Sequence, residues 1–230
     1  MTPRSLKLLS SMATRELLAE LAVLYEQRCG RRLVTEAAGG VDVARRVEGG
    51  EAMDLVVLAG GAIDKLIAGG RLVAGSRVDL VKSGIAMAVR GGAARPAIGS
   101  EAAVRDAVLG ARTLSYSTGP SGVYLEALFE RWGILEGIRG RIVVPAPGVP
   151  VASLVAAGAA ELGFQQMSEL TNIAGVEVLG PLPAEIQSLT TFAGALSRDC
   201  GAADEARAAL SFLASPDVAD IKRRYGMESA

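Results

Sequence analysis

The order in which short apolar runs and amphipathic segments follow one another constrains the fold of this chain most. Within the first 70 residues, three runs rich in Leu and Val alternate with three segments of helical periodicity. The strand-like runs are SLKLL, RRLVTEAAGG and MDLVVLAG, and the helix-like segments are SSMATRELLAELAVLYEQRCG, VDVARRVEGG and GAIDKLIAGG. A βαβαβα order is typical of a parallel sheet covered by helices, so the sequence predicts an α/β fold.

A second α/β set begins after GGAARPAIGS, a stretch rich in turn residues. Its predicted strands are ARTLSYS, GRIVVPAP, AELGFQQ and VEVLGPLP, and its predicted helices are SGVYLEALFERWG, GVPVASLVAAGA and MSELTN. Two further helices, GAADEARAALSFLAS and PDVADIKRRYGM, close the chain, the latter with Pro216 in its first turn.

Two long extended stretches, about residues 76–90 and 186–197, bracket this second set. If both cross between sheets, residues 1–80 and 190–230 form one lobe and residues 81–189 form the other. We therefore expect two Rossmann-like lobes joined by two crossover strands, with a cleft that closes by hinge motion.

Composition excludes several classes of site. The chain has 230 residues, half of them apolar, and a formal charge of −1, which gives no indication of a nucleic acid partner. It contains no histidine, and this excludes histidine-based triads and histidine metal ligands. We interpret the two cysteines, Cys29 and Cys200, as reduced core thiols, although one disulfide stays open. The sequence therefore predicts no metal and no cofactor.

The sequence leaves two locations open. It contains no apolar run of the roughly 20 residues that span a bilayer. Its start, MTPRSLKLLSSMATREL, lacks the apolar core and the cleavage site of a secretory signal. Either Met1 is the native start and the protein is cytoplasmic, or the chain has been trimmed and the protein is periplasmic.

Four strand-to-helix junctions are polar or rich in glycine, and open α/β sheets bind ligands beyond the carboxyl ends of their strands. Helix starts there would present backbone N–H groups to an anion. A local interpretation is also open, in which the serines cap helices, the glycines form turns and the glutamines end a solvated strand. The predicted ligand-binding residues are Ser10, Ser11, Gly39, Gly40, Thr118, Gly119, Ser121, Gln165 and Gln166, with Arg15 as a source of charge.

Four segments carry a resemblance to a known family. They are LLSSMATRELLAELAVLYE, GGVDVARRVEGGEAMDLVVLAG, GVPVASLVAAGAAELGFQQMSE and FLASPDVADIKRRYGM. In this order and spacing they resemble the type II periplasmic solute-binding proteins, specifically the molybdate-binding, extracellular solute-binding group. The resemblance covers nearly the whole chain. It implies the type II periplasmic-binding-protein fold, a small anionic ligand and an ABC transporter permease as a partner.

The resemblance also implies a ligand set. The family's contacts fall on Ser10 or Ser11, on Gly40, near Ser121, near Val149 and near Gln166. Two hydroxyl donors are absent, because glycine stands at 40 where the family has serine and glutamine near 166 where it has tyrosine. Unsatisfied oxygens cost about 1–3 kcal/mol each, which disfavours molybdate. The smaller side chains leave room for an organic di- or tricarboxylate, with Gln165 and Gln166 as its contacts and Arg15 as a charge partner.

Two functions follow from the resemblance. The first is a substrate-binding protein that closes on a small oxyanion or an organic carboxylate. The alternative is a cofactor-independent isomerase, because one branch of the group is similar to aconitate isomerase and would move a proton along an unsaturated tricarboxylate. Such a reaction needs a base, which without histidine is a carboxylate, a lysine or a tyrosine. Four residues lie near the predicted loops without the sequence favouring one, namely Glu36, Glu169, Tyr116 and Tyr124.

Overall fold

The computed structural model describes residues 5–146 and 149–230. The chain divides into two compact units: unit 1 comprises Met1–Lys82 and Thr191–Ala230, and unit 2 comprises Ser83–Thr190. The chain passes from unit 1 to unit 2 within strand β4 (Val78–Arg90) and returns within strand β8 (Leu189–Leu196). The fold is therefore α/β with two crossover strands, and these occupy the two long extended stretches of the sequence.

Unit 1 contains three parallel strands beside an antiparallel one. The parallel strands are β1 (Leu6–Ser11), β2 (Leu33–Ala38) and β3 (Leu55–Ala59), in the order β2-β1-β3-β8. β1 pairs in parallel register with β2 and with β3, whereas β8 runs antiparallel to β3. The carboxyl ends of β1, β2 and β3 therefore lie at one edge of the sheet. A two-residue strand, β9 (Glu228–Ser229), pairs with β4.

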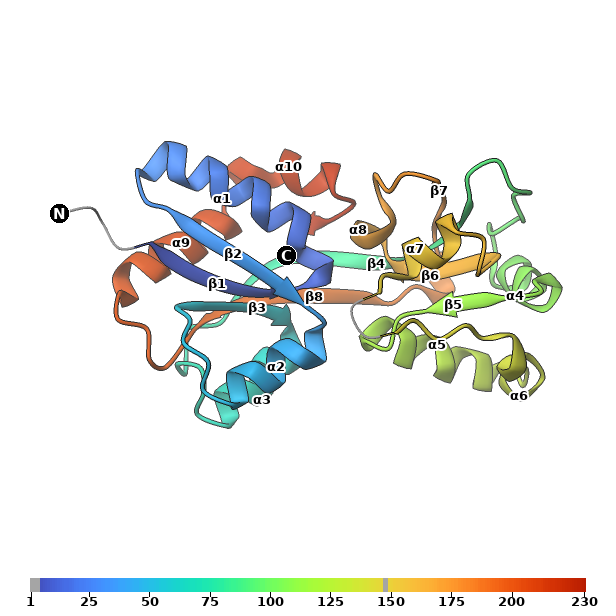
Figure 1. The fold of residues 1–230 in the computed structure, drawn as a ribbon, viewed down its shortest axis with the longest axis horizontal. Helices are drawn as coiled ribbons and strands as arrows, with labels where there is room; N and C mark the ends of the chain where they lie inside the picture. The colour runs from blue at the N-terminus through green and yellow to red at the C-terminus, as the bar shows by residue number, and fades with distance from the viewer. Residues whose placement is uncertain (1–4, 147–148) are drawn as a thin grey trace. The chain divides into compact units, whose positions relative to one another are not determined.

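Helices cover both faces of the unit 1 sheet, because its strands are apolar on both faces. Helices α1 (Arg15–Cys29), α9 (Ala203–Ala214) and α10 (Ala219–Arg224) lie on one face, and α2 (Gly40–Glu48) and α3 (Gly60–Ala68) lie on the other (Figure 1). Alternate strand residues serve the two layers: Leu8 packs in the first and Leu9 in the second. Helix α9 approaches so closely that a Cβ at Gly194 would lie 2.5 Å from Leu210 Cδ2.

Unit 2 repeats this layering around a second sheet. Its strands are β4, β5 (Leu114–Tyr116), β6 (Leu162–Gln166) and β7 (Val176–Pro181). β5 and β6 are parallel, and β4 is antiparallel to β6 and β7. Helices α4 (Glu101–Gly110), α5 (Pro120–Arg131) and α6 (Leu135–Ile138) lie on one face, and α7 (Val151–Ala156) and α8 (Met167–Leu170) lie on the other (Figure 1).

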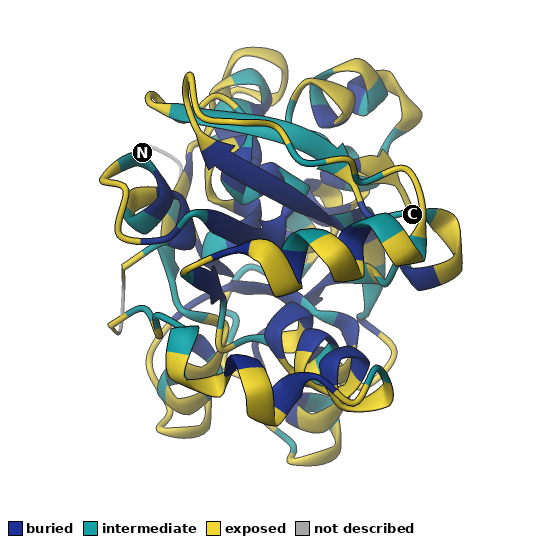
Figure 2. Ribbon diagram, turned by 90° about the vertical axis from the view of Figure 1, so that its right-hand side faces the viewer, coloured by how far each residue is buried: buried dark blue, intermediate teal, exposed yellow. Residues whose placement is uncertain are grey.

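Burial follows these layers in each unit. Strands are mostly buried, whereas most helices have a buried side and an exposed side (Figure 2). Lys222 of α10 departs from the usual exposure of lysine, because it is fully buried. Its Nζ donates to the carbonyl oxygens of Leu80 at 3.0 Å and Ala214 at 3.3 Å. The ammonium group therefore links α10 to β4 and to the end of α9.

Two elements differ from the prediction. The sequence pattern does not predict α4, whose buried apolar residues are only Val104 and Val108. The predicted strand over residues 140–147 is wrong within its described part, where Ile142 forms only an isolated bridge to Leu114. Proline at 145 lacks the N–H that a ladder needs. Pro147 and Gly148, at the junction of this predicted strand and the next predicted helix, lie outside the described residues.

Neither Cys29 nor Cys200 forms a disulfide, which confirms the prediction of reduced thiols. Cys29 is exposed at the end of α1, so its assignment to the core is wrong, whereas Cys200 is half-buried and packs against the unit 1 core. None of the described helices is both long enough and apolar enough to span a bilayer.

Candidate functional site

The ends of β1 and β2 bring Ser11 and Gly40 together in unit 1. Ser11 ends β1 opposite Ala38, and Gly40 begins α2 two residues later. A Cβ built on Gly40 would lie 3.9 Å from Ser11 Cβ and 3.9 Å from Leu58 Cδ2. Gly39, which precedes Gly40, is the N-cap residue of α2. Its carbonyl oxygen accepts from the N–H of Val43 at 2.9 Å. The loops that follow β1 and β2 therefore lie together at one edge of the unit 1 sheet.

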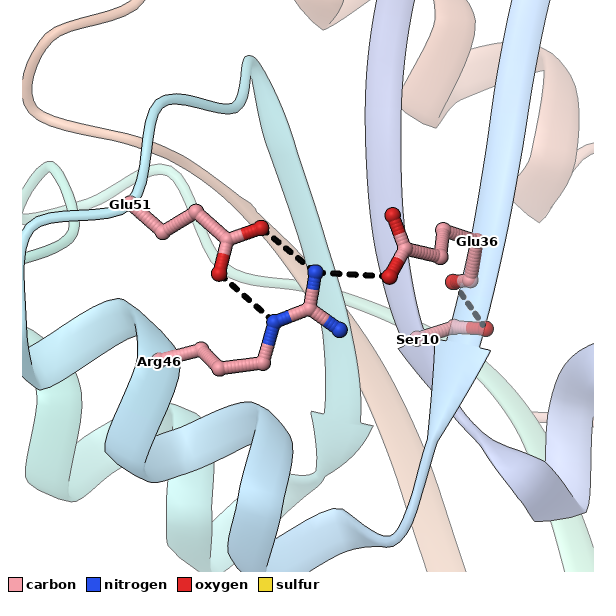
Figure 3. Close-up of polar contacts among 4 residues, drawn as sticks. All are labelled: Ser10, Glu36, Arg46 and Glu51. Carbon is pink, nitrogen blue, oxygen red and sulfur yellow. Dashed lines mark hydrogen bonds and ion pairs between the residues drawn. The ribbon is translucent and has the colours of Figure 1, made fainter.

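Ser10 and Ser11 project to opposite faces of β1 and differ in hydrogen bonding. Ser10 Oγ donates to the backbone oxygen of Glu36 at 3.4 Å (Figure 3). Ser11 Oγ is buried and has no hydrogen-bond partner among the described residues. Ser11 precedes the short 3-10 turn Met12–Thr14, yet its side chain makes no cap hydrogen bond there. Of these two serines, Ser11 is therefore the one whose hydroxyl makes no hydrogen bond to the described chain.

Arginines near these loops form ion pairs. Arg15 is exposed and pairs with the adjacent Glu16 at 2.7 Å. This ion pair offsets the positive charge that Arg15 was predicted to offer a ligand. Arg46 pairs with Glu36 at 2.6 Å and with both carboxylate oxygens of Glu51 (Figure 3). The hydrogen bonds to Glu51, and then to Glu36, raise the pKa of Arg46 above its ordinary value. The hydrogen bonds from Arg46 lower the pKa of Glu51.

In unit 2, hydroxyl groups brace the loop between β5 and α5. Ser117 Oγ and Ser121 Oγ lie 2.9 Å apart. Ser121 is buried and Thr118 is exposed. Gly119 is the N-cap residue of α5, and its carbonyl oxygen accepts from the N–H groups of Gly122 at 3.0 Å and of the next residue at 3.1 Å. These hydrogen bonds hold the loop against the first turn of α5.

Gly122 also belongs to this loop, although it is not among the predicted ligand contacts. A Cβ at Gly122 would lie 1.6 Å from the carbonyl oxygen of Ser117, so only glycine fits there. The sequence feature that could have indicated this role is a glycine inside the first turn of a predicted helix, because glycine has a low helix propensity. Gly122 allows the turn to fold back onto its own helix.

Gln165 and Gln166 end β6 and project to opposite faces of the unit 2 sheet. Gln165 Nε2 donates to Glu169 Oε1 at 2.7 Å, and Gln166 Nε2 donates to Thr190 Oγ1 at 2.9 Å. Both amide oxygens are buried and lack a hydrogen-bond partner within the described part of the chain. Each residue is only 4% exposed, so the interpretation of a solvated strand end is wrong.

The parallel pairing of β5 with β6 sets Tyr116 opposite Phe164, so the loop after β5 and the glutamines of β6 lie at the same edge. Val149, the remaining predicted contact of unit 2, is 39% exposed. Its N–H donates to the carbonyl oxygen of Ala146 at 2.9 Å, two residues before α7 begins.

A cavity of about 160 Å³ lies beside the β5–α5 loop in unit 2. Its lining is mainly apolar and includes Val123, Val144 and the Glu126 carboxylate. Burial, together with a hydrogen bond to Glu126 at 3.1 Å, raises the pKa of Tyr116 to about 12. A carboxylate among valines disfavours a small anion, so this cavity does not suit the predicted ligand.

A family model for the bacterial extracellular solute-binding proteins matches residues 6–228. The chain belongs to this family. The solute-binding protein is 37% identical to the aconitate isomerase of a Pseudomonas species, over 97% of this chain and 87% of that protein. The resemblance stated from the four sequence segments is confirmed.

Solved structures agree on the fold of this solute-binding protein. The periplasmic molybdate-binding protein of Azotobacter vinelandii matches with a TM-score of 0.81 and 20% identity, over 97% of this chain and 98% of that one. The sulfate-binding protein of Mycobacterium tuberculosis matches with a TM-score of 0.78 and 16% identity, over 98% of this chain and 86% of that one. The fold is that of the type II periplasmic solute-binding proteins.

Each unit of the solute-binding protein thus brings part of the predicted set together. Ser11, Gly39 and Gly40 share one edge in unit 1, and Gly119, Gln165 and Gln166 share one edge in unit 2, where Thr118 and Ser121 belong to the same loop as Gly119. Across the described residues, no three Cys, Asp or Glu side chains are grouped so as to hold a metal ion.

Proposed function

We propose that this solute-binding protein binds a small organic di- or tricarboxylate through residues at the carboxyl ends of its parallel strands. The proposal rests on Ser11, whose buried hydroxyl has no partner in the described chain and lies beside Gly40. Leaving such a group unsatisfied costs free energy. A carboxylate oxygen accepts a hydrogen bond from this hydroxyl and from backbone N–H groups at helix starts.

Two replacements favour a carboxylate over a compact tetrahedral oxyanion. Gly40 supplies no hydroxyl beside Ser11. Gln166 supplies an amide that can turn, because the Thr190 hydroxyl both donates and accepts. Its Nε2 is then available to a carboxylate at the unit 2 edge. Arg15 remains the proposed charge partner, shared with Glu16.

Calorimetry on the purified chain tests this proposal with succinate, tricarballylate, citrate, molybdate and sulfate. We expect a carboxylate to bind most tightly, and Ser11→Ala to weaken it about tenfold, since one buried hydrogen bond is lost. Ser10→Ala is the matched control and should keep the affinity, because the Ser10 hydroxyl faces the other side of β1 and bonds Glu36. Tighter binding of molybdate or sulfate, or an unchanged Ser11→Ala, contradicts the proposal.

The role in uptake is part of the same proposal. Members of a family of extracellular solute-binding proteins act outside the inner membrane, so we propose a periplasmic location and delivery of the ligand to an ABC transporter permease. Fractionation of cells that express the full-length protein tests the location.

A second candidate function is isomerisation of an unsaturated tricarboxylate, which the relative of 37% identity favours. In such a reaction a base removes a proton from the methylene carbon next to the double bond. The electron pair shifts along the allylic system, and a proton is returned to the distal alkene carbon. The developing charge rests on the adjacent carboxylate, which donors at helix starts stabilise.

Glu169 is the base we propose for that reaction. It is half-buried in α8, the helix that follows β6, and Gln165 Nε2 donates to its Oε1 at 2.7 Å. Among the other candidates from the sequence, Glu36 pairs with Arg46, Tyr116 bonds Glu126, and Tyr124 donates to the Ile186 carbonyl oxygen at 3.0 Å. Tyr116, with its pKa raised to about 12, is also a poor base at neutral pH.

Proton NMR of cis- and trans-aconitate in D₂O separates the two functions. An isomerase interconverts them and places solvent deuterium at the carbon that receives the proton. Glu169→Gln then abolishes turnover while calorimetry still detects binding. Saturable binding without interconversion assigns the chain to binding alone.

A further inference from the structure

Gln165 carries a buried hydrogen-bond acceptor that the described chain does not use. The residue is 4% exposed at the carboxyl end of β6. Its Nε2 donates to Glu169 Oε1 at 2.7 Å, whereas its Oε1 is buried without a partner among the described residues. One end of this amide is therefore fixed and the other end is open.

Glu169 determines which end of the amide is open. The Gln165 NH₂ group faces Glu169, whose Oε1 accepts its hydrogen bond. The atom that faces away must then be the oxygen. Gln166 differs, because its partner Thr190 Oγ1 can donate or accept and the amide can turn. Of these two glutamines, Gln165 is thus the one that presents an obligatory acceptor.

A buried amide oxygen is stabilised when a hydrogen-bond donor reaches it. A site that contains such an oxygen favours ligands that carry the donor over analogues that lack it. Fully ionised sulfate, molybdate or succinate carries no donor. A hydroxyl on the carbon chain does. We infer that the ligand of this site is a hydroxycarboxylate whose hydroxyl donates to Gln165 Oε1. The inference rests on the proposed carboxylate-binding function and narrows it, and it disfavours aconitate, which has no hydroxyl.

Matched ligands that differ by one hydroxyl test the inference. Calorimetry compares citrate with tricarballylate and malate with succinate on the native chain. We expect the hydroxylated member of at least one pair to bind about tenfold more tightly. In Gln165→Met, a substitution of similar length without the acceptor, the two members should bind equally. A melting curve confirms that the variant is folded.

Glu169→Gln tests the orientation argument separately. An amide at 169 can donate to Gln165 Oε1, which frees Gln165 Nε2 to face the ligand. The preference for the hydroxyl should then disappear or reverse, although Gln165 is still present. Gln166→Met is the matched control, in which the hydroxyl preference should survive even if the overall affinity falls.

Each outcome has a distinct meaning. If both members of each pair bind equally to the native chain, or if Gln165→Met weakens both by the same factor, Gln165 Oε1 is satisfied by a water molecule and the inference is wrong. If no carboxylate binds the native chain at all, the proposed function itself is wrong. A preference for the hydroxyl that is lost in Gln165→Met supports both.

Discussion

Gly122→Ala is the substitution for which the structure gives the sharpest expectation. The added Cβ would lie 1.6 Å from Ser117 O and 2.8 Å from Ser117 C, whereas real Cβ atoms essentially never approach a heavy atom within 3.0 Å. Both of these neighbours belong to the backbone, so no side-chain rotation relieves the clash. The turn that joins Ser117 to α5 must therefore open.

The magnitude follows from two opposing terms. Alanine gains about 1 kcal/mol over glycine in a helix interior, and less in the first turn, where Gly122 lies. Forced overpacking costs about 1–3 kcal/mol and more where the backbone must move. We therefore expect Gly122→Ala to lower the unfolding free energy by about 2 kcal/mol or more. We also expect weaker ligand binding, because the Ser117–Ser121 contact is disrupted.

Urea unfolding followed by tryptophan fluorescence measures this effect in the relevant unit. Trp132 is the sole tryptophan of the sequence, follows α5 directly, and has its ring centroid 5.8 Å from that of Phe129. Gly61→Ala is the matched control, since Gly61 also lies in a first helical turn and its added Cβ would have no described atom within 4 Å. Because Gly61 lies in unit 1, circular dichroism follows that variant. Gly61→Ala should be neutral or slightly stabilising. A Gly122→Ala variant as stable as the native chain would refute the steric argument.

Three further predictions concern other positions. Gly40→Ser should leave the fold intact, because its Cβ makes only ordinary contacts at 3.9 Å, and calorimetry should show a gain in affinity for molybdate or sulfate; no gain argues against a site at Ser11. Gly163→Ala should lower the unfolding free energy by about 1–3 kcal/mol in urea, since its Cβ would lie 2.4 Å from Val155 Cγ2. Burial lowers the pKa of Lys222 below 10.5, so between the two values the unfolded chain binds more protons than the folded chain. The unfolding free energy of the native chain relative to Lys222→Met should therefore rise as pH increases toward 10.5, and a flat or falling difference contradicts this.

The spacing of apolar residues predicted the layers of the fold, because that spacing depends directly on which side chains are buried. In unit 1, strands β1 and β3 are apolar on both faces, and short helices that end at glycines separate the strands, so a covered parallel sheet is the arrangement that buries them. Helix α4 was missed because only Val104 and Val108 of its ten residues are buried, a pattern too weak for periodicity to detect. The run IVVPAP looked like a strand because its valines are apolar, yet Val144 is 68% exposed.

The candidate site was predictable only at the level of loops. Glycines and hydroxyl residues at strand ends marked junctions that lie at one edge of the sheet in each unit, since parallel strands place their carboxyl ends together. The choice between Ser10 and Ser11 was not predictable, because it depends on which face of β1 meets α2. The role of Gly122 was hidden for a similar reason: the clash at its Cβ involves a carbonyl group whose direction no sequence pattern specifies.

A comparison within unit 2 supports a ligand role for Gln165. Gln187 is a half-buried amide in the same unit, but its Oε1 accepts from the N–H groups of Ile85 at 2.8 Å and Ser188 at 2.9 Å. Its Nε2 donates to the carbonyl oxygens of Ile85 at 3.0 Å and Leu182 at 3.3 Å. Gln187 thus shows how this fold completes an amide whose role is structural. Gln165, more deeply buried at a strand end and left with one obligatory acceptor open, is explained by a donor that comes from outside the chain.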